Sequence, residues 1–259
     1  MNMAQDFTGQ VAIVTGGSDG IGLATAILLA QRGAKVTICG RRPEQLAKAS
    51  EQAKAAGTSI EAVHLDVTDY DAFIALIERV ATEHGRLDML VNNAMSVHYA
   101  PLTKLSLDHW RQDFAVNSEA VFIGTRTAMK IMMQAGRGSI VNISSTTGIR
   151  AAPYMASYSA SKAALTHFTA CAAMEAGPAN VRVNAIVPGQ VMTAATDDWA
   201  SKVPETAAKT AQAIPMQRGG QPEELAEAII FLLSDAASYI TGVALPVDGG
   251  KAAQLYLPS

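Results

Sequence analysis

The feature that most constrains this chain is a short apolar strand that runs into a glycine-rich turn and then into an apolar helix. Val11-Ala12-Ile13-Val14 is a β-branched run typical of a buried parallel strand. Residues 15–22 follow with glycines at 16, 20 and 22, and an apolar helical pattern then ends at Gly33. Glycines let a backbone approach a pyrophosphate closely, and a helix N-terminus offers it unpaired N–H groups. The order predicts a dinucleotide-binding βα unit, with an ordinary glycine-rich turn as the alternative.

A second feature pairs a weak acid with a cation. Tyr158 and Lys162 are four positions apart, and Ser145 precedes Tyr158 by thirteen. In a helix, residues four apart share one face and are separated by about 6 Å of rise. A close ammonium favours a phenolate and can lower a tyrosine pKa from about 10 by about 1–3 units. We therefore expect Lys162 to lower the pKa of Tyr158 towards a value useful for proton transfer.

Strand and helix patterns alternate along the sequence. Candidate strands lie at 11–15, 35–39, 60–65, 88–91, 139–143, 181–186 and 243–247. Candidate helices between them include 43–56, 69–84, 107–134, 158–176 and 222–234. The alternation predicts an α/β fold: a single Rossmann-type, doubly wound parallel sheet of about seven strands, with helices on both faces, in one domain over residues 1–259. Ligands of such sheets bind at the carboxyl ends of the strands, and Gly16, Asn92, Ser145 and Pro188 all follow candidate strands.

Together these residues resemble the short-chain dehydrogenase/reductase family, in its ordinary single-domain, ketoreductase-like branch. The resemblance runs from about Phe7 to Gly250. Its matching segments are Thr15-Gly-x-x-x-Gly-Ile-Gly22, Asp66-Val67, Asn92-Asn93-Ala94, Phe114-Ala-Val-Asn117, Asn142-Ile-Ser-Ser145, Tyr158 with Lys162, Pro188-Gly189 with Thr193, Thr241-Gly242 and Val247-Asp-Gly-Gly250. It implies a nicotinamide-dependent oxidoreductase that interconverts a ketone and a secondary alcohol by hydride transfer.

The resemblance also implies a catalytic tetrad of Asn117, Ser145, Tyr158 and Lys162. Tyr158 would give a proton to the carbonyl oxygen or take it from the alcohol, and Ser145 would polarise that oxygen. Lys162 would lower the pKa of Tyr158 and hold the nicotinamide ribose, while Asn117 would hold a water that links Lys162 to solvent. Ser144 is one position too far from Tyr158, and a lone loop histidine such as His98 is more often structural or solvated.

The predicted cofactor contacts are Gly16, Ser18, Asp19, Gly20, Ile21, Gly22, Arg41, Arg42, Asp66, Val67, Asn93, Ala94, Tyr158, Lys162, Pro188, Gly189, Val191 and Thr193. Enzymes that select NAD usually end the second strand with an acid that binds the ribose hydroxyls. By resemblance Gly40 occupies that position, and Arg41 beside it can bind a 2′-phosphate with charge-assisted bonds. We predict NADP(H). NAD(H) is the alternative for two reasons. Asp19 stands where some NADP-binding relatives have a basic residue, and Arg41 and Arg42 could both be solvated instead of binding a phosphate.

The predicted substrate contacts are Met95, Val97, Ser145, Tyr154, Met155, Tyr158, Met192 and Trp199, and residues 190–216 could form a helical lid. Met95 replaces the usual glycine and would either narrow the pocket or shift its loop. The mostly apolar set favours a medium-sized apolar or cyclic ketone. A 3-oxoacyl thioester of acyl carrier protein or CoA is the competing substrate. A catalytically silent NADP(H)-binding regulator is an alternative of another class, although such proteins typically lose the tyrosine or lysine.

Composition narrows the partners and the compartment. The net charge of −3 gives no general electrostatic reason to bind nucleic acid, and no apolar run approaches the length of about 18 residues that a membrane span needs. The N-terminus lacks the pattern of a signal peptide, and Cys39 and Cys171 are expected to be reduced core residues, so a cytoplasmic protein is expected. No His or Cys cluster has metal-ligand spacing, so no metal is expected. The resemblance implies a homotetramer or homodimer built on the helices 107–134 and 158–176.

Overall fold

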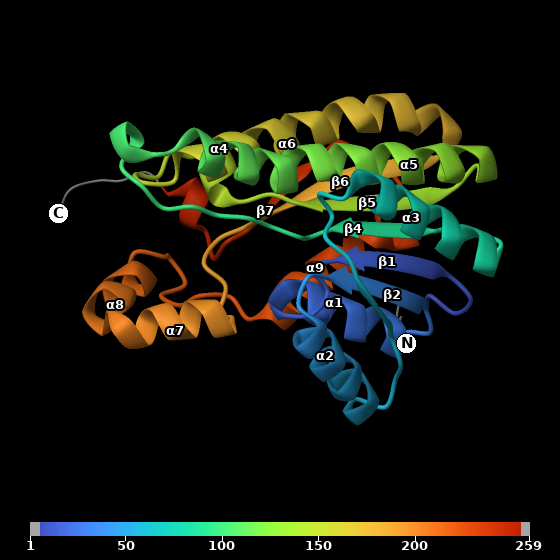
Figure 1. Cartoon of the computed structure of the whole chain (residues 1–259), viewed down its shortest axis with the longest axis horizontal. Coiled ribbons are helices and arrows are strands. Elements are labelled where there is room, and N and C mark those ends of the chain that lie inside the picture. The colour runs from blue at the N-terminus through green and yellow to red at the C-terminus, as the bar shows by residue number, and fades with distance from the viewer. Residues whose placement is uncertain (1–5, 255–259) are drawn as a thin grey trace.

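Seven parallel strands form one sheet in the computed structural model, which describes residues 6–254 (Figure 1). The strands are β1 Val11–Thr15, β2 Lys35–Gly40, β3 Glu61–His64, β4 Met89–Asn92, β5 Gly138–Ile143, β6 Val181–Pro188 and β7 Ala244–Val247. Their spatial order is β3-β2-β1-β4-β5-β6-β7. The predicted doubly wound α/β fold is confirmed, and every strand end lies within two residues of its predicted position.

Helices cover both faces of this sheet, as Figure 1 shows. The helices are α1 Gly20–Gln31, α2 Pro43–Ala55, α3 Tyr70–His84, α4 Leu107–Phe114, α5 Ala120–Ala135, α6 Ala156–Ala176, α7 Ala194–Lys202, α8 Pro204–Gln212 and α9 Pro222–Leu233. Side chains of α1, α2 and α9 pack on one face, and those of α3, α5 and α6 pack on the other. Within residues 6–254, none of these helices has the length and apolar character that a membrane crossing requires.

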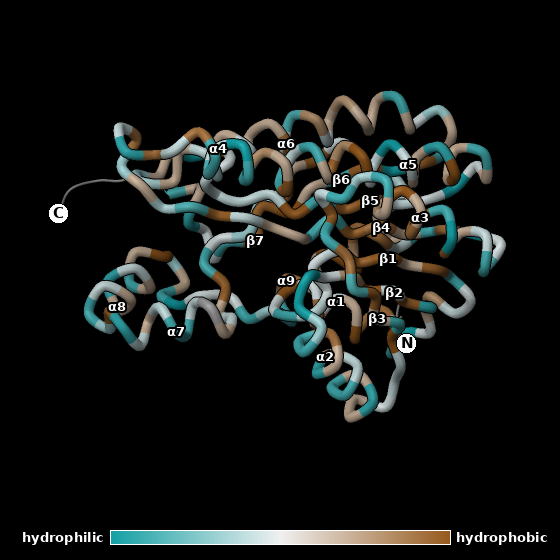
Figure 2. The backbone as a smooth tube through the Cα atoms, in the orientation of Figure 1, coloured by the Kyte–Doolittle hydropathy of each residue, from teal (hydrophilic) through white to brown (hydrophobic). Residues whose placement is uncertain are grey.

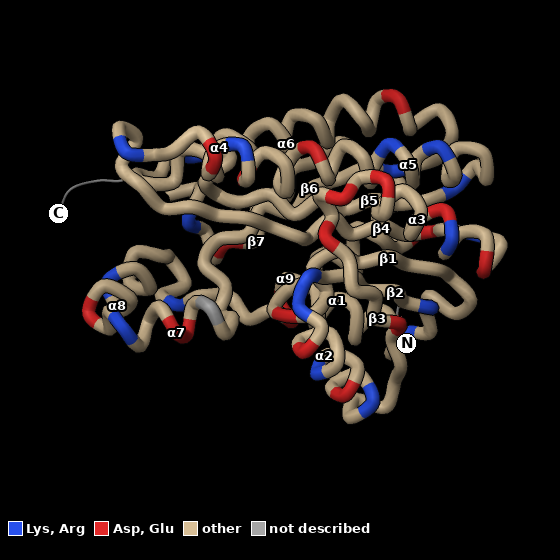
Figure 3. Tube along the Cα trace, in the orientation of Figure 1, with Lys and Arg blue, Asp and Glu red and all other residues tan. Residues whose placement is uncertain are grey.

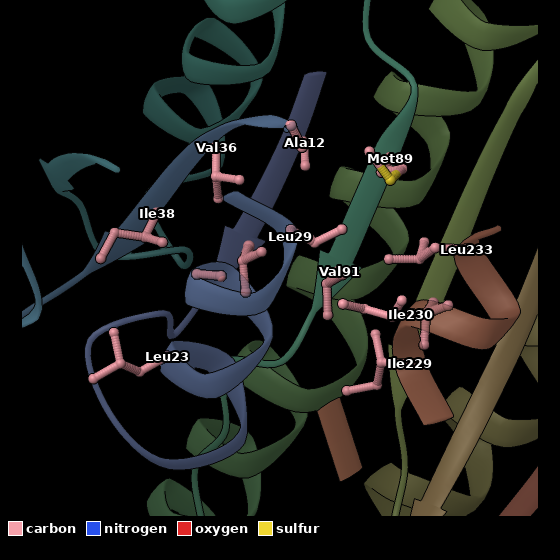
Figure 4. Packing of buried hydrophobic residues seen from close by; sticks show 14 of the residues in the cluster. Ala12, Leu23, Leu29, Val36, Ile38, Met89, Val91, Ile229, Ile230 and Leu233 are labelled. Carbon is pink, nitrogen blue, oxygen red and sulfur yellow. The ribbon is translucent and has the colours of Figure 1, made fainter. Parts of the chain in front are cut away.

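The strands feed alternate side chains into two separate cores. In β1, Ala12 and Val14 face α1 and α9, whereas Val11 and Ile13 face the opposite layer. Figure 4 shows the first core from close by, and Figure 2 shows hydrophobic residues concentrated along the sheet. Because both faces are buried, β1 reads as a continuous apolar run rather than an alternating one. Polar groups with a function must therefore emerge at the strand ends.

The predicted helix 107–134 is interrupted by a π-helical turn. Residues Ala115–Glu119 form this turn between α4 and α5, and Asn117 lies at its centre. A π-turn inserts extra backbone length and redirects the side chains around it, and such turns are frequent at functional sites. The apolar periodicity of this segment gave no sign of the interruption, since the chain stays helical on both sides.

The chain reverses its winding direction between β1 and β4. From β1 it moves outward through β2 and β3, then returns to place β4 on the other side of β1. Loops that follow two such strands diverge, and in doubly wound sheets the space between them is the usual ligand site. The glycine-rich segment follows β1, and the Asn93–Ala94 pair follows β4, so both meet at this point.

Close packing between α5 and the sheet gives a test of the fold. A Cβ added at Gly124 would lie 2.8 Å from the Phe73 ring and 2.9 Å from Asn92 Oδ1. We expect Gly124→Ala to lower the free energy of unfolding by about 1–3 kcal/mol through overpacking, measured by urea denaturation. Gly177→Ala is the matched control, because nothing lies within 4 Å of its added Cβ and its φ is −53°. Equal stability of the two variants would refute the packing account.

Candidate active site

The loop after β1 makes a backbone platform at the carboxyl edge of the sheet. Gly16 and Gly20 have φ values of +62° and +51°, which favour glycine. A Cβ on Gly16 would also lie 2.9 Å from Asn93 Nδ2, so the loop could not keep this path with a larger residue. Asp19 caps α1 by accepting a hydrogen bond from the Gly20 N–H at 2.7 Å. The first turn of α1 and its dipole thus begin at this loop.

Thr15 and Asn93 join this loop to the one after β4. The Thr15 hydroxyl accepts hydrogen bonds from the backbone N–H groups of Asn93 and Ala94, at 2.9 and 3.0 Å. In return the Asn93 amide donates to the carbonyls of Thr15 and Gly16, both at 3.0 Å. Asn93 therefore shapes the loop through its side chain. Thr15 was missed as a site residue, although its place at the end of a strand and before the glycines was a usable signal.

Two arginines and two acids meet where β2 ends. Arg41 Nη1 lies 3.6 Å from Asp66 Oδ2, and Arg42 Nη2 lies 3.5 Å from Asp19 Oδ2. Burial raises the pKa of Asp66, but hydrogen bonds from Thr68 and the charge of Arg41 outweigh it, so the pKa is lowered. All four charged groups are substantially exposed, so these ion pairs are screened and weak.

The loop after β6 approaches the glycine-rich loop from the other side. Thr193 caps α7, and its Cγ2 would lie 3.0 Å from a Cβ added at Gly20. Gly189 follows the strand directly, and its added Cβ would lie 2.9 Å from the backbone of Asp248. The predicted residues Pro188, Gly189, Val191 and Thr193 therefore share one edge with the predicted residues of the first loop. Ser18 lies beside Gly40, while Ile21 and Gly22 form the first turn of α1.

These observations answer whether the edge fits a dinucleotide. At Gly16, Gly20 and Gly189, protein atoms already lie within 3.0 Å of an added Cβ, so these loops keep their close-packed paths only with glycine. A helix N-terminus faces the same loop, and its N–H groups suit a pyrophosphate. Asp66 and Val67 follow β3, on the same edge as Arg41. The residues present fit a dinucleotide: the N-terminus of α1 would hold its pyrophosphate, and Arg41 and Asp66 would face its adenosine end.

Tyr158, Lys162 and Ser145 come together beneath the β4 and β5 loops. Lys162 is 1% exposed; its Nζ lies 5.8 Å from the centroid of the Tyr158 ring and donates to the Ile143 carbonyl at 2.7 Å. Ser145 stands just after β5 and is hydrogen-bonded to Tyr158, which lowers that tyrosine's pKa. The neighbouring Ser144 instead pairs with the Thr166 hydroxyl at 2.6 Å, a structural contact.

The expected direction of the Tyr158 pKa shift is not the one observed. Burial raises the pKa of Tyr158 to about 12, the hydrogen bond with Ser145 opposes this, and electrostatic interactions with Tyr99 and Asp113 raise the pKa further. Burial also lowers the pKa of Lys162 to about 7, since a charged ammonium is poorly solvated there. The prediction counted the charge of Lys162 but not the desolvation of both partners.

Asn117 is fully buried and its side chain is occupied by protein groups. Its amide donates to the Ser96 carbonyl at 2.8 Å and to the Ser161 hydroxyl at 3.0 Å, and its oxygen accepts from the Ser96 N–H at 2.9 Å. Both N–H donors of the amide are thus used. These hydrogen bonds tie the π-turn to the β4 loop and to α6.

A buried acid that the sequence reasoning missed lies one turn before Asn117. Asp113 is 0% exposed and accepts hydrogen bonds from the Ser96 hydroxyl at 2.8 Å and the Ser157 hydroxyl at 2.5 Å. It also contacts the backbone N–H of His98 at 3.3 Å and its Nδ1 at 2.8 Å. His98 therefore has the structural partner expected of it. The signal in the sequence was the spacing of Asp113 and Asn117, which places both on one helix face.

The predicted substrate residues come from three segments. Met95 and Val97 lie in the β4 loop, with Met95 52% exposed. Tyr154 is 62% exposed and has a φ of +66°, a left-handed conformation that is uncommon for tyrosine, and its carbonyl accepts from the Ala100 N–H. Met155 directly precedes α6, which carries Tyr158. Met192 and Trp199 lie in the segment from the β6 loop to α7, and residues 190–216 contain α7 and α8.

Comparison with known proteins gives one family. A family model described as enoyl-(acyl carrier protein) reductase matches residues 15–252. The 3-oxoacyl-[acyl-carrier-protein] reductase FabG of Thermotoga maritima is 39% identical over 93% of this chain and 97% of its own. The cis-4-hydroxycyclohexanecarboxylate dehydrogenase of Sinomonas cyclohexanicum is 41% identical over 97% of this chain and all of its own.

A solved structure agrees with these relatives. A Beutenbergia cavernae protein, described as an NAD(P)-dependent gluconate 5-dehydrogenase and solved with NADP at low occupancy, superimposes with a TM-score of 0.90. It is 36% identical, and the match covers 97% of this chain and 100% of that one. The likeness therefore extends over the sheet, both helical layers and the loops at the carboxyl edge.

The burial of Lys162 predicts a cost in stability that depends on pH. Its pKa falls from 10.5 to about 7 on folding, so the cost is full below pH 7 and disappears as the pH rises towards 10.5. We expect Lys162→Met to raise the free energy of unfolding by about 1–3 kcal/mol at pH 7, after the loss of the Ile143 hydrogen bond. The gain should shrink between pH 7 and 10, measured by urea denaturation. Lys130→Met, at an exposed position, should show no such pH-dependent gain.

Proposed function

The chain belongs to the short-chain dehydrogenase/reductase family, and from that premise we propose that it is an NADP(H)-dependent enzyme that interconverts a ketone and a secondary alcohol with Tyr158 as the proton donor and acceptor. The family makes it an oxidoreductase that acts on CH–OH groups. The observation that carries the proposal is the joint placement of Tyr158, Ser145 and Lys162 at the sheet edge where the glycine-rich loop lies.

Each residue has a physical role in the proposed reaction. A bound nicotinamide supplies the hydride for reduction and accepts it for oxidation. Tyr158, with its pKa raised to about 12, is protonated at neutral pH and can give its proton to a carbonyl oxygen. Ser145 donates a hydrogen bond to the same oxygen and fixes its orientation. Lys162 uses one of its three N–H donors on Ile143, which leaves two for ribose hydroxyls.

The charges at the end of β2 support NADP(H) over NAD(H). No carboxylate stands at Gly40, and Arg41 beside it can bind a 2′-phosphate. Asp19 counted against this choice, but Arg42 lies 3.5 Å away and offsets its charge. Arg41 is now paired with Asp66 at 3.6 Å, a weak exposed contact that a phosphate can displace. The Beutenbergia cavernae structure, with NADP bound, is consistent with this choice.

For the substrate we propose a medium-sized apolar or cyclic ketone and its alcohol. Met95, Tyr154 and Trp199 offer exposed apolar surface on three segments of the site. The relative from Sinomonas cyclohexanicum is named for a ring alcohol. The second candidate is a 3-oxoacyl thioester, which the Thermotoga maritima relative supports. In the view of Figure 3, Lys and Arg positions are mixed with Asp and Glu positions along the tube, a pattern that gives an acidic carrier protein no particular support. A silent regulator is the least supported choice, since Ser145, Tyr158 and Lys162 are all present and close.

Three further parts of the proposal concern assembly and location. Residues 190–216, with α7 and α8, act as a lid on the single domain. The chain forms a homotetramer or homodimer through α5 and α6, where Phe122, Leu165 and Phe168 line a shallow apolar hollow. The protein works in the cytoplasm, where thiols stay reduced. Cys39 is a buried free cysteine as expected, whereas Cys171 is also free but exposed, so the expectation of a core residue is wrong for it.

Replacement of the proton donor tests the proposed chemistry. We expect Tyr158→Phe to lower kcat by about 10²–10⁴-fold with cyclic ketones and NADPH, followed at 340 nm, because it removes general acid catalysis. Binding of NADPH, measured by fluorescence, should persist. Tyr239→Phe is the matched control at a fully exposed position and should keep full activity. Full activity of Tyr158→Phe would refute the mechanism, and turnover of thioesters alone would select the second substrate class.

Removal of one guanidinium tests the cofactor choice. We expect Arg41→Ala to lower kcat/KM for NADPH by about 10–100-fold, since a charge-assisted contact with the 2′-phosphate is lost. The value for NADH should change by less than about threefold, because NADH lacks that phosphate. Gly40→Asp should act in the same direction and also improve the use of NADH. A native enzyme that prefers NADH would overturn this assignment.

A further inference from the structure

Two clusters of hydrogen bonds join the β4 loop, the segment from α4 through the π-turn, and α6. In the first cluster, Asp113 accepts hydrogen bonds from the Ser96 hydroxyl at 2.8 Å and from the Ser157 hydroxyl at 2.5 Å. In the second, Asn117 bonds the backbone of Ser96 and donates to Ser161 at 3.0 Å. The two clusters contact α6 at Ser157 and Ser161, the residues that directly precede Tyr158 and Lys162. Asn117 belongs to the family pattern named above, whereas Asp113 has no place in it.

Hydrogen bonds to both oxygens compensate the burial of the Asp113 carboxylate. A buried carboxylate is costly unless hydrogen bonds compensate its desolvation. Each oxygen of Asp113 accepts two contacts: Oδ1 from the Ser96 hydroxyl and His98 Nδ1, and Oδ2 from the Ser157 hydroxyl and the His98 N–H. The His98 ring is held further by stacking on His109, with centroids 4.1 Å apart. The carboxylate therefore fixes both the β4 loop and the first turn of α6.

We propose that Asp113 is a positioning residue for the proton transfer: it holds Tyr158 through Ser157, and it holds the substrate-facing β4 loop through Ser96 and His98. The inference rests on the proposed function, because it assigns Tyr158 the transferred proton. It deepens that function by naming the group that fixes the distance between the tyrosine and the loop carrying Met95 and Tyr99. A backbone hydrogen bond from the Ala100 N–H to the Tyr154 carbonyl also joins the β4 loop to the segment before α6.

The charge of Asp113 also bears on the pH at which the tyrosine works. The groups that face Tyr158 are Lys162 on its own helix, Ser145 after β5, Tyr99 on the β4 loop and Asp113 on α4. Burial raises the pKa of Tyr158 most, and electrostatic interactions with Tyr99 and with the Asp113 carboxylate raise it further. Alcohol oxidation needs the phenolate, so its rate rises with pH as this group loses its proton. Loss of the Asp113 charge should move that rise to lower pH.

Two variants separate the charge from the contact. Asp113→Asn removes the charge but can keep the contacts. Its amide oxygen, placed as Oδ2, accepts from the Ser157 hydroxyl and the His98 N–H. Its amide nitrogen, placed as Oδ1, donates to the Ser96 hydroxyl and, in the other ring tautomer, to His98 Nδ1. We expect its alkaline rise in kcat for alcohol oxidation to shift down by about 0.5–1.5 pH units. Ser157→Ala keeps the acid but cuts its link to α6, and it should lower kcat by about 3–30-fold with a small change in KM.

Ser159→Ala is the matched control. Its hydroxyl flanks Tyr158 on the other side, is buried, and has no hydrogen-bond partner among the residues the structure describes. It should match the native enzyme in kcat, KM and pH profile, and thermal unfolding of each variant should report its fold.

Each outcome bears on the proposal. Native kinetics and an unshifted pH profile in both Asp113→Asn and Ser157→Ala would overturn it, even if both unfold at lower temperature, because the acid would then be merely structural. If Asp113→Asn does not fold, the kcat of Ser157→Ala against Ser159→Ala decides. Retained activity in Tyr158→Phe would instead overturn the proposed function itself, so the two failures are distinguishable.

Discussion

Burial of both faces of the parallel sheet is the constraint on which the rest of the structure depends. Strand side chains alternate between two apolar cores, so neither face can carry exposed polar chemistry. The strand ends are left, and parallel strands bring all their carboxyl ends to one edge. At that edge backbone groups need partners other than strands, which Thr15 and Asn93 supply across the β1 and β4 loops. The same hydrogen bonds that satisfy the edge also shape the glycine-rich platform.

The pair of Tyr158 and Lys162 shows how far that geometry controls chemistry. Their helical spacing places the ammonium near the ring. Burial nevertheless favours the neutral form of each group, so it raises the pKa of Tyr158 and lowers the pKa of Lys162. The Ile143 carbonyl compensates Lys162 in part. Such a site is held against its own desolvation by the surrounding core, as strained functional sites commonly are.

Patterns in the sequence predicted the strands, the layers and the residues at the carboxyl edge, because periodicity and turn residues act locally. They could not predict the π-turn at Asn117, since apolar spacing is similar on both sides of it. They also missed Asp113, because an acid on an amphipathic helix normally faces water, and its four donors come from residues far apart in the chain. The direction of the Tyr158 pKa failed for the same reason: burial is a property of the assembled fold.

The protein groups around Tyr158 favour one direction of the proton transfer proposed for it. Burial, Tyr99 and Asp113 all favour the neutral phenol, whereas the Ser145 hydrogen bond favours the phenolate. A neutral phenol is the form that gives a proton to a carbonyl oxygen, so reduction finds the tyrosine ready at neutral pH. Oxidation must first form the phenolate, and a nearby positive charge would make that step easier. The surrounding side chains therefore favour Tyr158 as a proton donor. Its use as a base depends on pH and on the charge of the bound reactants.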